Sequence, residues 1–284
     1  DVRVAKRNKA LHGAFGSASS ETEAAVETLK YVRQEMRAHT AILDEIRILQ
    51  RIATAIAMGQ NVDEVTVSHP TFAAKFWLPD LLLDRMQQIL FDTRNFYEIE
   101  QLEYLARFAP KDAVFVDVGA NIGNHSIYFA RALGARRIHC FEPQPHAQRI
   151  LTENLKRNAL EEVAVLHRIA LAAEAGSISP RAGFKPRNLG GTGFEITERG
   201  AFECRRLDEV VAEPFDVLKI DVEGMEPMVF TGAGDLIPTH RPIVWVETRP
   251  GTDYFRDLAS WFENLGYSHH SMPKTRKNHL FVPL

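Results

Sequence analysis

Three carboxylates in this 284-residue chain, Asp117, Glu142 and Asp221, each end a short apolar run. Such runs are typical of parallel strands that are covered on both faces of a sheet. Ligands of an open parallel sheet bind beyond the carboxyl ends of its strands. We therefore expect the three carboxylates to face one crevice and to contact a ligand there.

The first run leads into a turn with the spacing Asp117-x-Gly119-x-x-x-Gly123, and a helix follows from Asn124 or His125. Glycines allow a tight turn, and a helix start presents free N–H groups to a ligand. The turn lacks the first glycine pair of a dinucleotide loop and the Gly-Lys-Ser/Thr of a phosphate loop. Its carboxylate would repel a diphosphate but attract the cationic groups of S-adenosylmethionine. A purely structural strand–helix turn is the alternative.

The second acid, Glu142, ends the run Ile138-His-Cys-Phe. It follows Gly123 by roughly the 20 residues that a crossover helix needs. An acid at this place can accept hydrogen bonds from both ribose hydroxyls of an adenosine. Glu142 therefore favours an adenosine cofactor over a solvated side chain before a turn, but it does not separate S-adenosylmethionine from a nicotinamide dinucleotide.

The third run, Val217 to Ile220, ends in the acid-rich sequence Asp221-Val-Glu223-Gly-Met-Glu226. Asp221 and Glu223 would then face the same crevice as the first two acids. In the structural alternative, Asp221 caps the following helix and Glu226 is a first-turn acid that the helix dipole favours.

Taken in order, several separated motifs make the chain similar to FkbM-type methyltransferases over about residues 95–284. They are Tyr97-Glu98, Phe115-Val-Asp-Val-Gly-Ala-Asn-Ile-Gly-Asn-His, Phe141-Glu-Pro, Leu207-Asp208 and Leu218-Lys-Ile-Asp-Val-Glu-Gly-Met-Glu. The resemblance implies a class I, Rossmann-like fold that uses S-adenosylmethionine. It further implies methylation of a hydroxyl oxygen on a sugar, glycan or polyketide-type acceptor.

The resemblance also assigns roles to residues. The cofactor-binding set lies around the turn and the strand ends: Asp117, Gly119, Ala120, Asn121, Gly123, Asn124, Glu142, Pro143 and Asp221. Asp221 and Glu223 would lie near the site of transfer and are the candidate catalytic bases, with His125 in reserve. A divalent cation held by Asp221, Glu223 and Glu247 is a further hypothesis, since hard cations bind oxygen ligands.

Two other functions remain open at this point. A nicotinamide oxidoreductase would need the dinucleotide loop that is absent here. A catalytically degenerate scaffold, displayed by an oligomerising helix, would keep the fold without turnover. Net charge of −3 argues against general nucleic-acid binding. Two cysteines without metal-ligand spacing indicate a reducing, cytoplasmic setting, and no apolar run has the length of a membrane span.

The elements that must position these residues follow from the apolar pattern. We expect strands at 114–118, 138–141, 163–167, 217–221, 243–247, 267–271 and 279–282. Five strand–helix steps and a closing hairpin predict an α/β fold, a doubly wound seven-stranded sheet with a terminal β-hairpin. The segment from Ala175 to Arg206 is expected to be a long functional loop, with Arg181, Lys185 and Arg187 available to an acidic acceptor.

Four parts are expected along the chain. Residues 1–20 read as a flexible segment, and 21–60 as a long amphipathic helix that is a candidate for homo-oligomerisation. Its apolar stripe is wider than a strict coiled-coil seam. Residues 61–110 read as a helical lead-in, with Asp80 as a helix cap and Asn95 and Glu98 as a capping box. Residues 111–284 form the S-adenosylmethionine-binding domain.

Overall fold

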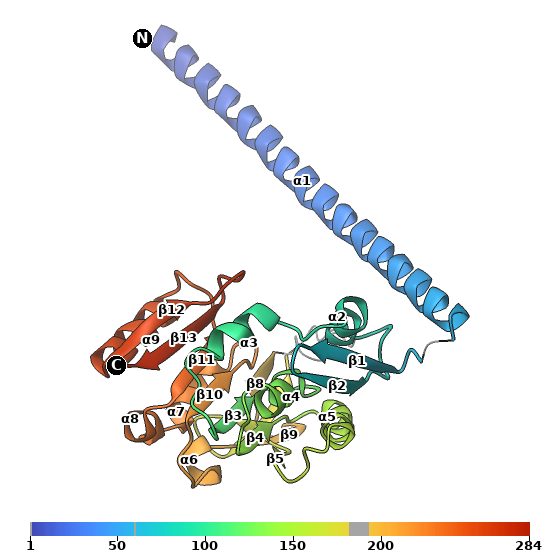
Figure 1. Cartoon of the computed structure of the whole chain (residues 1–284). Helices are drawn as coiled ribbons and strands as arrows, with labels where there is room; N and C mark the ends of the chain where they lie inside the picture. The colour runs from blue at the N-terminus through green and yellow to red at the C-terminus, as the bar shows by residue number, and fades with distance from the viewer. Residues whose placement is uncertain (1, 60, 182–192) are drawn as a thin grey trace. The chain divides into compact units, whose positions relative to one another are not determined.

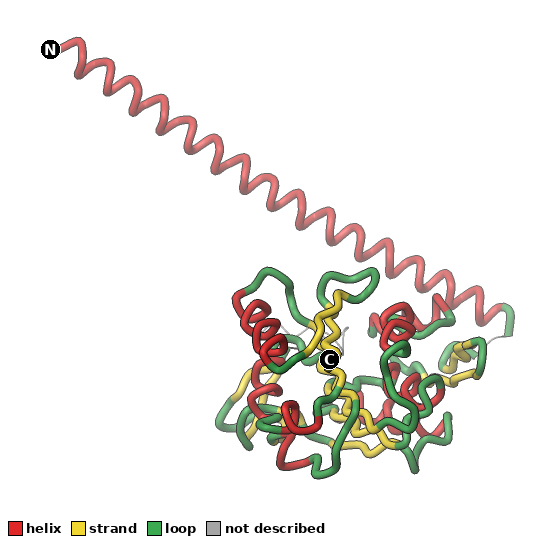
Figure 2. The backbone as a smooth tube through the Cα atoms, turned by 60° about the vertical axis from the view of Figure 1, so that its left-hand side comes forward, coloured by secondary structure: helices red, strands yellow, loops and turns green. Residues whose placement is uncertain are grey.

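The computed structural model describes residues 2–59, 61–181 and 193–284. The chain divides into two compact units, Asp1–Gln60 and Asn61–Leu284. The first unit is one continuous helix, α1 (Val2–Ala57), which Figure 2 draws as an unbroken coil. No helix in the described part of the chain combines the length and the apolar character that crossing a membrane requires.

The start of α1 differs from the flexible segment that the glycines and serines of residues 1–20 predict. The structure continues the helix through these residues from Val2. Single glycines cost a helix only about 1 kcal/mol each, and the neighbouring alanines and lysines are strong helix formers. Further along α1, many large apolar side chains are exposed, among them Leu29, Met36, Leu43 and Ile56. Oligomerisation through this stripe stays a prediction, which light scattering of a variant lacking residues 1–60 would test.

The second unit is built on a seven-stranded sheet (Figure 1). In spatial order its strands are β12 (Tyr267–Ser271), β13 (Asn278–Pro283), β11 (Ile243–Glu247), β10 (Val217–Ile220), β3 (Val114–Val118), β4 (Arg137–Phe141) and β5 (Ala164–His167). The five strands from β11 to β5 are parallel, whereas β13 is antiparallel to both β11 and β12. The predicted doubly wound sheet with a terminal hairpin is confirmed.

Alternate residues of the central strands pack on opposite faces of this sheet, and helices lie on both sides of the strands (Figure 2). On one face, Phe115 of β3 stacks on Phe129 of α4 (Asn124–Arg131) with ring centroids 4.6 Å apart. On the other face, Val116 and Ile220 join a core with four helices from later in the sequence. These are α6 (Leu207–Val210), α7 (Glu226–Gly232), α8 (Leu236–His240) and α9 (Asp253–Asn264). Helix α5 (Pro145–Arg157) connects β4 to β5.

The lead-in before the sheet begins with a hairpin, not with a helix as predicted. Strands β1 (Glu64–His69) and β2 (Phe72–Trp77) pair in antiparallel register. The alternation of buried Val65 and Val67 with polar neighbours is the strand signal that the helical interpretation overlooked. Asn154 of α5 accepts a hydrogen bond from the Trp77 backbone N–H at 2.6 Å, so the hairpin is fixed to the α/β core.

Two predicted helix caps in this lead-in are wrong. Helix α2 (Arg85–Thr93) is capped by Asp84, which accepts a hydrogen bond from the Gln87 N–H, and not by Asp80. Helix α3 (Ile99–Leu105) follows Glu98, which has a left-handed backbone (φ 56°) and makes no side-chain cap. The Asn95 side chain accepts from the Phe96 N–H instead of completing a capping box. The carboxylate of Glu98 is consequently available to other partners.

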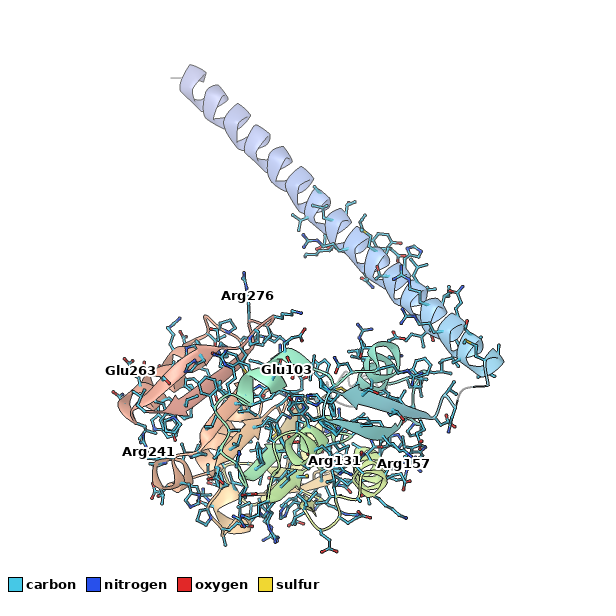
Figure 3. All side chains as sticks on the ribbon, viewed as in Figure 1. Glu103, Arg131, Arg157, Arg241, Glu263 and Arg276 are labelled. Atoms are coloured by element: carbon cyan, nitrogen blue, oxygen red, sulfur yellow. The ribbon has the colours of Figure 1, made fainter. Side chains whose placement is uncertain are left out.

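The segment expected to be a long loop, Ala175 to Arg206, contains three of the four strands of a second sheet. Its strands are β6 (Ala170–Leu171), β9 (Phe202–Arg205), β7 (Gly176–Pro180) and β8 (Phe194–Ile196), in that spatial order. Lys185 and Arg187 fall outside the described residues. Charged side chains such as Arg241, Glu263 and Arg276 project outward from the second unit (Figure 3).

Candidate active site

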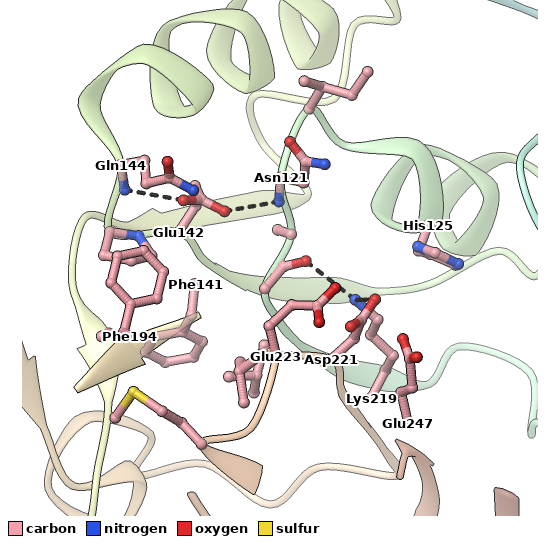
Figure 4. Close-up of a pocket in the computed structure, with 18 of the residues that line it drawn as sticks. Asn121, His125, Phe141, Glu142, Gln144, Phe194, Lys219, Asp221, Glu223 and Glu247 are labelled. Atoms are coloured by element: carbon pink, nitrogen blue, oxygen red, sulfur yellow. Dashed lines mark hydrogen bonds and ion pairs between the residues drawn. The ribbon is translucent and has the colours of Figure 1, made fainter. Parts of the chain in front are cut away.

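A cavity of about 190 Å³ opens at the carboxyl ends of β3, β4, β10 and β11. Most of the residues that the sequence singles out line its wall: Gly119, Ala120, Asn121, Asn124, His125, Glu142, Pro143, Asp221, Glu223 and Glu247. The structure thus brings together side chains from four separate strand ends (Figure 4). Their roles as cofactor-binding or catalytic residues remain predictions.

The two halves of the cavity meet at Gly119. Its backbone is left-handed (φ 81°), and a Cβ atom there would lie 2.0 Å from the backbone oxygen of Asp221. Only glycine lets the turn after β3 pass this close to the end of β10. Gly119 therefore sets the spacing between the Glu142 end and the Asp221 end of the cavity.

At one end of the cavity, backbone groups hold the carboxylate of Glu142. It accepts hydrogen bonds from the N–H groups of Asn121 at 3.0 Å and Gln144 at 2.9 Å (Figure 4). Burial raises the pKa of Glu142 to about 7, although these two hydrogen bonds oppose the shift. The Asn121 Oδ1 atom is buried and has no hydrogen-bond partner among the described residues. Acceptors with spare capacity suit a ligand that brings hydroxyl or amino donors, as adenosine does.

At the other end, a buried lysine organises the strand ends. Lys219 Nζ donates to the Gly119 carbonyl at 3.1 Å and lies 3.2 Å from Asp117 Oδ1 and 3.8 Å from Asp221 Oδ2. Burial alone would lower the pKa of Lys219, but the two carboxylates outweigh it and raise the pKa. Lys219 is therefore a buried ammonium cation that links β10 to the turn after β3.

The acids around this lysine form a compact group. Carboxylate oxygens of Asp221, Glu223 and Glu247 lie within 4.8 Å of one another. Burial raises the pKa of Asp221 well above its usual range, with Lys219 opposing and Glu247 adding to the shift. Lys277 lies 2.9 Å from Glu247. Two of the three carboxylates thus already have an ammonium group nearby, and the metal hypothesis stays untested.

Two residues of the predicted cofactor set stand behind the cavity wall. Asp117 is fully buried, where its Oδ2 accepts from Ser126 Oγ at 2.6 Å and its Oδ1 faces Lys219. Gly123 precedes α4, and a Cβ atom there would lie 2.8 Å from Leu151 Cδ1. Both residues therefore pack against the protein interior and support the turn without lining the cavity. The alternative in which Asp221 caps a helix is wrong, since α7 begins at Glu226 after Met225.

A strap before α3 crosses the first turn of α4. The Asn124 side chain accepts from the Tyr97 N–H at 2.9 Å and donates to the Tyr97 carbonyl at 3.0 Å. One residue on, Glu98 Oε2 lies 3.2 Å from His125 Nε2. The strap thereby places Tyr97 on the cavity wall, next to the ring of His125.

Sequence reasoning missed several residues of the site. Lys219 had a detectable signal, because a lysine inside an otherwise apolar strand is almost never buried without a partner. Arg85, Met86 and Ile89 of α2 line the cavity without any motif to indicate it. Cavity-lining residues from segments far apart in the sequence can be identified only from the structure.

Comparisons with known proteins agree with this geometry. A family model described as the methyltransferase FkbM domain matches residues 117–268. The methyltransferase SdnD of Sordaria araneosa is 30% identical over 206 residues, which cover 54% of this chain and 78% of that protein.

Two solved structures are also similar to the chain. A methyltransferase FkbM from Methylobacillus flagellatus has a TM-score of 0.48 and 17% identity, over 69% of this chain and 54% of that one. This chain thus corresponds to about half the length of that structure. TYW2 of M. jannaschii, solved in complex with AdoMet, has a TM-score of 0.41 and 14% identity, over 77% of this chain and 84% of the other.

The matched family region begins at Asp117 and includes both Glu142 and Asp221, so it spans both ends of the cavity. A methyltransferase of this family implies S-adenosylmethionine as the methyl donor. The chain belongs to the FkbM methyltransferase family.

Proposed function

We propose that the protein transfers a methyl group from S-adenosylmethionine to a hydroxyl oxygen of a sugar, glycan or polyketide-type acceptor. The observation that carries the proposal is the cavity with two different ends, one at Glu142 and one at Asp221. When bound, S-adenosylmethionine supplies a methyl group made electrophilic by its sulfonium. The protein's own residues then need only to bind the donor and the acceptor and to accept the proton that leaves the acceptor hydroxyl.

In this proposal the donor's adenosine lies at the Glu142 end. Glu142 keeps lone pairs beyond those used by the Asn121 and Gln144 N–H groups, and ribose hydroxyls can donate to them. Such charge-assisted hydrogen bonds contribute about 1.5–3 kcal/mol each. Asn121 Oδ1, buried and unpartnered among the described residues, would gain a donor.

The acceptor would lie at the Asp221 end, where carboxylates can accept hydrogen bonds from several hydroxyls of one polyol. Asp221 and Glu223 come from the turn after β10, and Glu247 ends β11. Orientation of two reactants in one cavity can contribute on the order of 7–11 kcal/mol to lowering the barrier. Carboxylate oxygens are also suitable ligands for a hard cation. Two of these three carboxylates, however, already have an ammonium group nearby, Lys219 beside Asp221 and Lys277 beside Glu247.

Donor binding can be tested before the acceptor is known. Calorimetric titration should show micromolar binding of S-adenosylmethionine, no binding of NADH, and weaker donor binding by Glu142→Ala. Binding of NADH instead would overturn the donor assignment. No binding of either would favour a degenerate scaffold.

Acceptor chemistry can be tested with a radiolabelled methyl donor and paired methyl glycosides. Each pair holds one sugar with a free hydroxyl and its analogue with an amine at the same carbon. Label transfer to the hydroxyl sugars supports the proposal, and transfer only to the amines would overturn oxygen as the acceptor atom.

A further inference from the structure

A chain of side-chain hydrogen bonds leads from the sheet to the cavity wall. Trp245 Nε1 donates to Asn278 Oδ1 at 3.1 Å, and Asn278 Nδ2 donates to Glu98 Oε1 at 2.6 Å. The other oxygen of Glu98 lies 3.2 Å from His125 Nε2. Trp245, Asn278 and His125 are all at least nine-tenths buried. We call this series of hydrogen bonds, from Trp245 to His125, the relay.

The relay has only one consistent set of donors and acceptors. An indole nitrogen can only donate, so Asn278 must present its oxygen to Trp245 and its amide nitrogen to Glu98. Glu98 must then accept from both sides, as a carboxylate does. Burial alone would raise the pKa of Glu98, but the hydrogen bonds from His125 and Asn278 lower it.

A carboxylate at Glu98 fixes the tautomer of His125. Nε2 must carry the hydrogen that points at Glu98, and the neutral ring then leaves its lone pair on Nδ1. The described residues form a hydrogen bond with the His125 ring at Nε2 and none at Nδ1, and His125 lines the cavity (Figure 4). A histidine oriented by a carboxylate, with its second nitrogen free, is the arrangement of a general base.

We propose that His125 accepts the proton of the acceptor hydroxyl and that Glu98 is its positioning residue. The inference rests on the proposed function. The O–H bond of the acceptor breaks and its proton moves to Nδ1. The oxygen lone pair forms the new bond to the methyl carbon, while the carbon–sulfur bond breaks and leaves its electron pair on sulfur. Asp221 and Glu223 then serve to hold the acceptor's other hydroxyls.

The backbone supports this assignment. Glu98 is one of eight non-glycine residues with a left-handed backbone in the described structure (φ 56°). Such a conformation costs of order 1 kcal/mol or more and is typical of functional sites. Here it turns the carboxylate toward Asn278 and His125 instead of toward the N–H groups of α3.

A structural test reads the tautomer directly and needs no acceptor. The full chain is labelled with ¹⁵N-histidine, and the His125 signals are identified by their loss in His125→Gln. Long-range proton–nitrogen spectra should show a hydrogen on Nε2 and a bare Nδ1, and Glu98→Gln should abolish this preference. A hydrogen on Nδ1 in the wild type would overturn the proposal, whatever the acceptor is.

A kinetic test uses the methyl glycosides described above. His125→Gln keeps an amide near the place of Nε2 but has no Nδ1, so it should bind S-adenosylhomocysteine normally and lose about 10²–10⁴-fold in kcat. Glu98→Gln should lower kcat at unchanged KM.

The other charged groups beside Tyr97 and Glu98 are Lys219, Asp221, Glu223 and Glu247, and all four stay unchanged in these variants. If Glu98→Gln only lowers thermal stability and leaves both kcat and the tautomer of His125 in place, its role is structural and the proposal fails. If no glycoside is methylated by the wild type, the proposed acceptor is wrong, and the ¹⁵N spectra still decide the tautomer.

The chain offers a matched control outside the cavity. His139 Nε2 lies 3.0 Å from Glu213 Oε1, so it is another buried histidine held by a glutamate. His139→Gln should leave kcat unchanged. A comparable loss of kcat in this variant would show that removing any buried histidine is enough, and would overturn the assignment to His125.

Discussion

The two ends of the cavity are built by different means. Glu142 is held by two backbone N–H groups, that of Gln144 two residues further along the chain and that of Asn121 in the turn after β3. At the other end, Lys219 and the acids around it are held by side chains from strands that lie far apart in the sequence. The first end therefore depends on backbone donors around one acid, whereas the second is a balance of several charged side chains. We infer that the Asp221 end is the more sensitive to single substitutions.

The largest effect is expected from a substitution at Gly119, where the two ends of the cavity meet. Gly119→Ala places a Cβ atom 2.0 Å from the Asp221 carbonyl oxygen, at a backbone conformation (φ 81°) that alanine rarely adopts. We expect a loss of more than about 4 kcal/mol in the free energy of unfolding, measured with urea, and no detectable binding of S-adenosylhomocysteine.

Gly134→Ala is the control for this substitution. Gly134 also has a left-handed backbone (φ 65°), but nothing lies within 4 Å of the place that a Cβ atom would take there. It should therefore cost only about 1 kcal/mol. Equal losses in the two variants would mean that backbone strain, and not the contact with Asp221, explains Gly119.

The next test removes the cation at the Asp221 end. Lys219→Met leaves Asp117 buried beside an apolar side chain, with 2% and 0% of the two side chains exposed in the wild type. Breaking a buried ion pair by removing one partner costs about 3–5 kcal/mol. Adding Asp117→Asn should restore part of that loss. No recovery in the double variant would show that the charge of Asp117 is not what Lys219 balances.

The Glu142 end should respond more mildly. Glu142→Gln keeps the shape of the side chain but weakens charge-assisted hydrogen bonds to a ligand. We expect the Kd of S-adenosylmethionine to rise about tenfold or more, with a small change in unfolding free energy. A wild-type Kd in this variant would remove Glu142 from the donor site.

The pH dependence of donor binding is a further test of the Glu142 end. Because the pKa of Glu142 is about 7, donor affinity should fall as the pH is lowered from about 8 to about 6, and Glu142→Gln should be free of this dependence. In the absence of the donor, protonation of Glu142 affects the free energy of unfolding, and this pH dependence has the opposite sign. The folded protein binds the proton more tightly than the unfolded chain does, so this group's contribution to stability is full at acidic pH and is lost as pH rises through about 7.

The smallest effect is expected from metal removal. Lys219 and Lys277 already lie near Asp221 and Glu247, so the acids do not need a cation for charge balance. EDTA should change the rate of methyl transfer by less than about twofold, a difference well under 1 kcal/mol. A larger loss that Mg²⁺ restores would establish the three acids as a metal site.

Local pattern was enough to predict the strands of the seven-stranded sheet and the acids at their ends, but not the β1–β2 hairpin or the four-stranded sheet. A buried strand and a glycine turn leave signals within a few residues, which is why Asp221 and Glu142 could be placed before the structure was known. The relay could not be predicted, because Glu98 and Asn278 are 180 residues apart and the Tyr97-Glu98 motif does not indicate which residues Glu98 contacts. The capping-box interpretation of Glu98 was reasonable locally and wrong because the fold brings it stronger partners than the N–H groups of α3.

Helix α2 has a consequence for the shape of the cavity. Arg85, Met86 and Ile89 line the cavity, yet they precede the region, residues 117–268, that this chain shares with the family model. Part of the cavity wall is thus encoded outside the matched region. A substitution in α2 can therefore reshape the cavity while every residue of the matched region stays the same.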